Sequence, residues 1–260
     1  MEKDEEEKVK RTIKLTLNKL SPGNFDRLKV QLLEQGKQSE AVLYLLSRCI
    51  FDKACSEVKF TELYAALCQF ISHEYTQLQQ SSDATDPARC KDVRTSQLFK
   101  RNVLVVCQEV FEEDPSEHDF TGLTDEEVLT KKSTIKKRTL GNVRFIGELF
   151  KVGFISARTV LQCVIDMTHP MMKDEEDFKK INLDEVNEDK LEGATTLLRT
   201  GGCKFSEPKL KEKTAYIMRF LEHIISSERL SQRVKFLLMV SITQNILDLH
   251  RQGWTQKTSR

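Results

Sequence analysis

The 260-residue sequence has few of the residues that mark turn-rich or membrane-spanning proteins. Five prolines and ten glycines are too few for an all-β chain or a long linker. No apolar run approaches the roughly 18 residues that a membrane span requires, and the mean hydropathy is −0.45. The N-terminus, Met-Glu-Lys-Asp-Glu-Glu-Glu, is the opposite of a signal peptide. We therefore expect a cytoplasmic protein without membrane association.

Paired-cysteine motifs are also missing. The seven cysteines are odd in number and include no Cys-x-x-Cys, which argues against a disulfide framework or a zinc cage. Most lie in apolar stretches with helical spacing, where a free thiol behaves as a small hydrophobe. This usage indicates a reducing compartment.

Signatures of catalysis are absent as well. The chain has no Gly-x-x-x-x-Gly-Lys phosphate loop, no Gly-x-Ser-x-Gly and no Gly-x-Gly-x-x-Gly. His73 and Glu74 are followed at position 77 by Gln, so the two-histidine zinc helix is incomplete. We expect a protein that is not an enzyme and that holds no cofactor and no metal.

The net charge of +1 conceals strong segregation. Residues 112–127 carry eight acidic side chains and no Lys or Arg, whereas residues 131–144 carry six basic side chains and no acid. The basic run is either a solvated helix face that balances the acidic stretch or a contact for RNA. It contains no aromatic platform, so RNA binding there would be backbone-directed and not sequence-specific. The candidate RNA-binding residues are Lys131, Lys132, Lys136, Lys137 and Arg138.

Apolar residues recur with helical spacing almost throughout, and no segment shows sustained strand alternation. Short connections favour antiparallel pairing of consecutive helices. We predict an all-α fold: one α-solenoid of about five stacked antiparallel HEAT-like helix pairs over residues 1–260, with an ordered core of about 9–255. The predicted helices are 5–19, 22–35, 40–54, 60–75, 95–112, 125–151, 156–168, 187–200, 208–226 and 230–249.

Several boundaries have local signals. Ser21 is a candidate N-cap, and Pro22 suits the first helical position because its missing N–H costs nothing there. Thr124 and Glu127 predict a capping box, and Ser156 can open a helix. Two polar connections, at 76–92 and 169–186, are typical of long surface loops.

Four blocks of sequence form a specific pattern. The first reads Leu-Asn-Lys-Leu-Ser-Pro and then Phe, and the last reads Arg-Thr-Leu-Gly-Asn-Val-Arg-Phe-Ile-Gly-Glu-Leu-Phe-Lys. The blocks lie in residues 15–28, 51–68, 99–112 and 138–151. In this order the chain resembles the middle-domain family of eukaryotic translation initiation factor 4G, a helical scaffold that holds a DEAD-box RNA helicase.

The resemblance implies helicase contacts at Leu17, Leu20 and Phe25, although physics alone favours a core role for these three. Phe236 matches a second helicase-contacting aromatic near the family's C-terminal end. There the chain departs from the family, as if residues 240–244 were inserted before Leu-Asp-Leu. Five extra helical residues turn the following face by roughly 140° net.

The resemblance further implies a monomeric translation-initiation scaffold that binds and stimulates a 4A-type DEAD-box helicase, with weak RNA binding. We expect the chain to be excised from a longer protein that carries sites for other initiation-complex proteins. Two alternatives stay open: a related scaffold that sequesters the helicase or acts in cap-independent regulation, and an RNA-binding solenoid without a helicase partner.

Overall fold

A computed structural model of the chain shows an all-α protein, as the sequence predicts. The part of the chain that it describes forms ten α-helices and one 3-10 helix, with no strand. No helix in this part is long and apolar enough to cross a membrane. The described residues are 2–77, 87–112, 120–168, 187–201, 205, 209–226, 228 and 230–251. At 2–5, 87–93, 112 and 245–251 the description covers the backbone and not the side chains.

The helices fall into two compact units, residues 1–154 and 155–260. That the units form one continuous domain stays a prediction. The helices of the first unit are α1 (Glu2–Asn18), α2 (Phe25–Gly36), α3 (Glu40–Ser56), η1 (Val58–Phe60), α4 (Thr61–Gln77), α5 (Pro87–Glu112) and α6 (Asp125–Lys151). Those of the second are α7 (Ala157–Thr168), α8 (Glu188–Gly201), α9 (Lys211–Ile225) and α10 (Gln232–Arg251).

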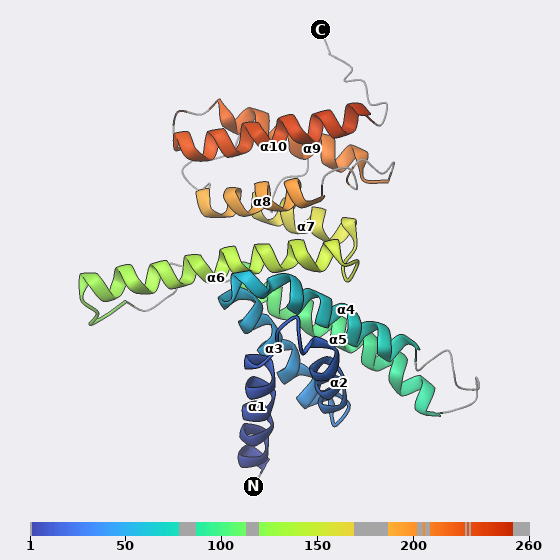
Figure 1. The fold of residues 1–260 in the computed structure, drawn as a ribbon. Coiled ribbons are helices and arrows are strands. Elements are labelled where there is room, and N and C mark those ends of the chain that lie inside the picture. The colour runs from blue at the N-terminus through green and yellow to red at the C-terminus, as the bar shows by residue number, and fades with distance from the viewer. Residues whose placement is uncertain are drawn as a thin grey trace. The chain divides into compact units, whose positions relative to one another are not determined.

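Consecutive helices pack in pairs, in agreement with the predicted HEAT-like arrangement. α1 packs on α2, α3 on α4, α5 on α6, α7 on α8, and α9 on α10. In the first unit α3 is central, since it also packs against α1, α2, α5 and α6 (Figure 1). Its sequence explains this position, because buried side chains lie on nearly every side of the helix. In the second unit α8 packs against both α7 and α10.

The corner between α1 and α2 closes differently from the prediction. α2 begins at Phe25 and not at Pro22, and Ser21 does not cap it. The side chain of Asn24 closes the turn through two hydrogen bonds. Its Oδ1 accepts from the Ser21 N–H at 2.8 Å, and its Nδ2 donates to the Lys19 carbonyl at 2.6 Å. One amide thus satisfies a carbonyl left open by the end of α1 and an N–H of the turn.

Other boundary signals behave as expected. Thr124 and Glu127 form the predicted capping box at the start of α6. The Ser156 hydroxyl accepts from the Thr159 N–H at 3.2 Å and opens α7. The predicted loop at 76–92 is wrong at both ends, because α4 continues to Gln77 and α5 already starts at Pro87. The predicted loop at 169–186 lies outside the described residues.

The cysteines with described side chains are free thiols. Four are buried and Cys163 is half-buried; the five are Cys49, Cys55, Cys68, Cys107 and Cys163. Burial raises the pKa of the Cys55 thiol to about 12 and that of Cys163 to about 11. Thiols this far from ionisation pack as small hydrophobes and are poor nucleophiles.

Candidate functional site

The first predicted contact region is the corner between α1 and α2. Leu17 is fully buried and Leu20 is 6% exposed, so both belong to the core of the first unit. α1 packs against α3 as well as α2, so it has more than one neighbour in this unit. Of the three predicted corner residues, Phe25 alone keeps part of its side chain at the surface.

Phe25 is held by a local cluster of charge and aromatic rings. The Lys29 ammonium lies 5.3 Å from the centre of the Phe25 ring and 4.6 Å from that of Phe70. The same ammonium forms an ion pair of 2.6 Å with Asp26. A cation over a ring contributes about 0.5–1 kcal/mol at exposed sites, so Lys29 restrains Phe25 in a defined orientation.

The second predicted contact region is on α10. Phe236 is 66% exposed, and Met239 and Val240 are 49% and 40% exposed. Positions three and four residues apart share one side of a helix, so these residues form an exposed apolar row. The opposite side of α10 is buried through Val234, Leu238 and Ile242.

The apparent insertion at residues 240–244 does not interrupt α10. The helix runs unbroken from Gln232 to Arg251, so the extra residues extend it without a bulge. Met239 and Val240 were not singled out from the sequence. Their signal was available, because with Phe236 they repeat at helical spacing on a side that the buried residues do not need.

The basic run lies on α6, whose N-terminal half extends past the helices it packs on (Figure 1). The buried residues of α6 all lie between Gly141 and Phe150. Lys132, Lys136 and Lys137 are exposed, while Lys131 and Arg138 are partly covered.

The run itself contains no aromatic residue, as expected, but the structure places an aromatic ring from outside the run beside it. Phe120 precedes α6, and its ring centre lies 5.2 Å from the Lys131 ammonium and 5.7 Å from that of Lys132. The sequence places Phe120 inside the acidic stretch, which concealed this proximity.

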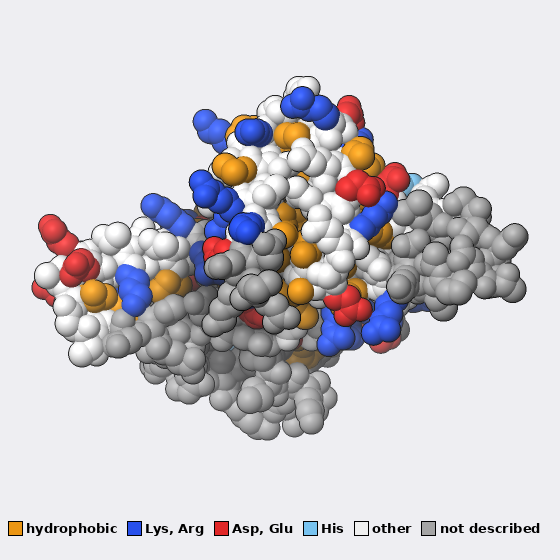
Figure 2. Space-filling model, turned by 90° about the horizontal axis from the view of Figure 1, so that it is seen from below, with side chains coloured by type: hydrophobic (Ala, Val, Ile, Leu, Met, Phe, Trp, Pro, Cys, Tyr) orange, Lys and Arg blue, Asp and Glu red, His pale blue; other side chains and the backbone are white. Residues whose placement is uncertain are grey.

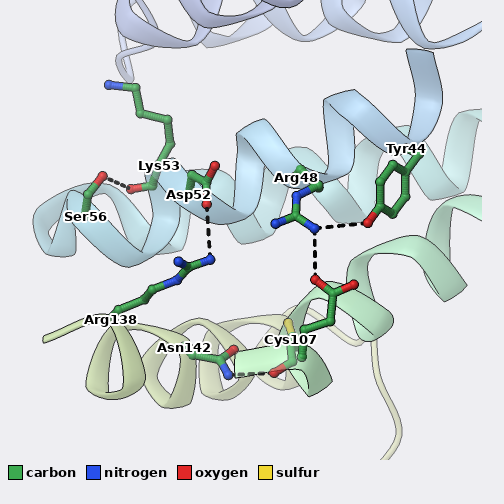
Figure 3. Close-up of polar contacts among 9 residues, drawn as sticks. Tyr44, Arg48, Asp52, Lys53, Ser56, Cys107, Arg138 and Asn142 are labelled. Atoms are coloured by element: carbon green, nitrogen blue, oxygen red, sulfur yellow. Dashed lines mark hydrogen bonds and ion pairs between the residues drawn. The ribbon is translucent and has the colours of Figure 1, made fainter. Parts of the chain in front are cut away.

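A cavity of about 520 Å³ lies between the end of α3, η1 and α6, all within the first unit. Lys137 and Arg138 of the predicted run reach it, as does Arg144, which sequence reasoning missed. Its lining residues are Asp52, Cys55, Ser56, Val58, Thr134, Lys137, Arg138, Leu140, Gly141 and Arg144. Arg138 faces Asp52 across the cavity with a nitrogen–oxygen distance of 3.8 Å (Figure 3).

Polar contacts fix the helices that form this cavity. Asn142 on α6 donates from Nδ2 to the Cys107 carbonyl of α5 at 2.8 Å. Arg48 on α3 donates to Glu109 of α5 at 2.9 Å and to the Tyr44 hydroxyl at 3.0 Å (Figure 3). α3, α5 and α6 are therefore tied together beside the cavity.

Figure 2 shows one face of the molecule as a mixed surface. On its described part, Lys and Arg side chains lie next to hydrophobic ones, and acidic side chains lie at the left-hand end and at several other places. Among the described residues, no group of three His, Cys, Asp or Glu side chains is arranged to hold a metal ion.

Comparison with known proteins decides the family. A sequence profile of the MIF4G domain matches residues 10–244. The chain belongs to the MIF4G domain family. The structure is also similar to the crystal structure of the MIF4G domain of Trypanosoma cruzi translation initiation factor EIF4G5, with a TM-score of 0.51 and 16% identity. That match covers 96% of this chain and 100% of the other, and it shows a shared fold.

Similar full-length proteins are initiation factors. This MIF4G domain is 30% identical to eukaryotic translation initiation factor 4G of Triticum aestivum, over 98% of this chain and 16% of the relative. It is 27% identical to human eukaryotic translation initiation factor 4 gamma 2, over 98% of this chain and 27% of the relative. The chain thus spans only part of the length of such proteins, from 13% of the Oryza sativa factor 4G to 27% of the human factor 4 gamma 2.

Proposed function

We propose that this MIF4G domain is a translation-initiation scaffold that binds and stimulates a 4A-type DEAD-box RNA helicase. The observation that carries the proposal is the exposed apolar row of α10. Phe236, Met239 and Val240 stay at the surface although the opposite side of the same helix is buried. An exposed row of this kind, in a family resembling helicase scaffolds, supports a protein contact.

The proposed contacts lie one in each compact unit. Phe25 and its restraining residue Lys29 contribute the contact of the first unit, and the α10 row contributes that of the second. Leu17 and Leu20 remain part of the proposed corner as positioning residues, because they pack under the turn that carries Phe25. Their burial removes them from direct contact in this conformation.

Such a scaffold acts without chemistry of its own. DEAD-box helicases have two lobes joined by a flexible linker, and a partner that holds both lobes restricts their relative orientation. A scaffold that binds the productive arrangement more tightly raises its population and thereby the rate of ATP turnover. The nucleotide belongs to the helicase, and this chain is neither an enzyme nor a cofactor carrier in the proposal.

A weaker interaction with RNA accompanies the helicase contact. The basic run of α6 supports this interaction, since three of its lysines are exposed and the Phe120 ring lies beside Lys131, the first residue of the run. In this proposal the domain works as a cytoplasmic monomer, and other initiation-complex proteins bind the remainder of the parent chain.

The test is binding to a purified 4A-type helicase, measured by calorimetry, together with RNA-dependent ATPase assays. Phe236→Ala removes a side chain whose burial is worth about 1.5–3 kcal/mol, so we expect a loss of affinity of about tenfold. Phe25 is already half-buried, and Phe25→Ala should weaken binding about fivefold. Phe236→Ala should reduce ATPase stimulation more than binding, because the corner still anchors one lobe.

Leu129→Ala is the matched control. Leu129 is 67% exposed on α6 and lies outside both proposed contacts, so its truncation should leave helicase affinity unchanged. All variants must keep the melting temperature of the parent. If folded Phe25→Ala and Phe236→Ala variants bind as tightly as the parent, the helicase assignment fails. Inhibition of the ATPase by the parent would indicate a sequestering scaffold.

A further inference from the structure

The cavity between α3 and α6 has a lining that no helicase contact uses. Its volume of about 520 Å³ lies within the range of small-molecule sites, about 300–1,000 Å³. One wall is apolar, from Val58 and Leu140. Val58 is 47% exposed although it belongs to a short helix at the edge of the unit core. Both a flat apolar group and a charged group therefore find a complementary surface there.

The charged side of the cavity has an excess of cations. Lys137, Arg138 and Arg144 face a single carboxylate, that of Asp52, which pairs with Arg138. Among the described residues, Lys137 and Arg144 have no ion-pair partner. Two basic side chains at one cavity without counter-charge are suited to a phosphate group.

Helix geometry separates these cations from the rest of the basic run. Thr134, Lys137, Gly141 and Arg144 recur at intervals of three or four residues and share one side of α6. At about 100° per residue, Lys132 lies roughly 160° and Lys136 roughly 120° away from the middle of that side. The five predicted RNA-binding residues therefore do not form one surface.

The N-terminal part of α6 leads from the cavity toward an aromatic ring. Lys131 lies one turn before Thr134, about 60° around the helix from it, and its ammonium is 5.2 Å from the centre of the Phe120 ring. From Lys131 to Arg144 the helix rises about 20 Å. Cations along a track with an aromatic ring at one end are typical of single-strand binding surfaces.

We propose that this cavity holds one nucleotide of single-stranded RNA, with its phosphate on Lys137 and Arg144 and its base against Val58 and Leu140. The inference rests on the proposed RNA interaction and assigns it to one side of α6. The strand then passes Lys131 toward Phe120. Because phosphate and ring faces are common to all nucleotides, the cavity does not select a sequence.

Fluorescence anisotropy of a labelled twelve-nucleotide oligo(U) with the full chain, over a series of salt concentrations, tests the assignment. Lys137→Gln with Arg144→Gln removes both contacts to that one phosphate, which should lower the salt slope by about 0.7 and weaken binding about tenfold at low salt. The matched control is Arg158→Gln with Lys213→Gln, which removes the same charge from exposed positions of α7 and α9. We expect it to leave the slope unchanged and to weaken binding less than threefold.

Two single variants distinguish direct contact of RNA with the cavity from attraction to the overall positive potential of the domain. Asp52→Asn removes the one carboxylate of the cavity, so oligo(U) should bind about twofold more tightly. Val58→Ala shortens the apolar wall, and it should weaken binding about threefold with no change in the salt slope. Loss of structure alone cannot produce a tighter complex, which keeps Asp52→Asn informative.

Equal loss of slope in the cavity and control double variants would overturn the cavity assignment and leave the general RNA interaction in place. No binding of oligo(U) by the parent at low salt would overturn both. A labelled poly-glutamate peptide should bind at least tenfold more weakly than oligo(U); tighter peptide binding would identify an acidic-protein site instead. The cavity variants should bind the helicase like the parent, so the two proposals fail independently.

Discussion

Replacing Gly141 by alanine should separate α3 from α6. A Cβ atom at this position would lie 2.5 Å from the Cys55 carbonyl oxygen and 2.8 Å from the Cys55 Cα. Both are backbone atoms and cannot rotate away, so one helix must move. Overpacking of this kind costs about 1–3 kcal/mol, and alanine recovers up to about 1 kcal/mol through its higher helix propensity. We expect a net destabilisation of about 1–2 kcal/mol.

Urea denaturation followed by circular dichroism measures this loss, and hydrogen exchange of the α3 and α6 amides locates it. The matched control is Gly23→Ala, because a Cβ there has no atom within 4 Å and no strained backbone to accommodate. That variant should be neutral or stabilised by about 0.4–1 kcal/mol. A Gly141→Ala protein as stable as the parent, with unchanged exchange in α3 and α6, would refute the close helix approach and with it the geometry of the cavity.

Three further predictions concern stability. Leu17→Ala truncates a fully buried side chain and should lower the free energy of unfolding by about 2–5 kcal/mol, as measured by urea denaturation. A near-neutral result would contradict the burial of Leu17. Asn24→Ala loses both hydrogen bonds of the corner and should cost about 1–2 kcal/mol, whereas Pro22→Ala, at an exposed turn position, should cost less than 0.5 kcal/mol by the usual range for surface substitutions. Burial raises the pKa of the Glu57 carboxyl, but hydrogen bonds from Lys53 and Tyr64 outweigh it and the net pKa is lowered. Glu57 therefore stabilises the fold above its unfolded pKa near 4.5, and this stabilisation is lost as pH falls through the lower folded value. The stability difference between the parent and Glu57→Gln should shrink between pH 6 and pH 3, as judged by urea midpoints; a difference independent of pH would contradict the assignment.

The periodicity of apolar residues was sufficient to predict most helices, because each helix must bury one side. The predicted 125–151 helix agrees with α6 at both ends, where a capping box marks its start. The start of α5 was missed because residues 87–94 are half charged and half small or apolar, without the large apolar residues at helical spacing that distinguish a helix from a loop. The corner was misassigned because Ser21 and Asn24 are both capping residues, and their hydrogen bonds depend on the turn geometry.

The candidate binding surfaces could be predicted from the sequence less well than the helices. An apolar residue that packs in the core and one that contacts a partner are the same residue types, so Leu17 and Phe236 could not be separated before burial was known. The cavity depends on Asp52 and Arg144, which lie 92 positions apart and are brought together by the packing of α3 on α6. No local pattern encodes such a pairing.

The buried thiols give the protein a set of internal reporters. Cys49 and Cys55 lie on α3, Cys68 on α4 and Cys107 on α5, so three different helices each carry at least one buried thiol. A thiol that is covered and far from ionisation reacts with an alkylating reagent only when its helix opens. Mass spectrometry of timed alkylation would therefore resolve the opening of individual helices in the native chain. Helicase or RNA binding can then be followed as slower modification of particular cysteines, without introducing a label.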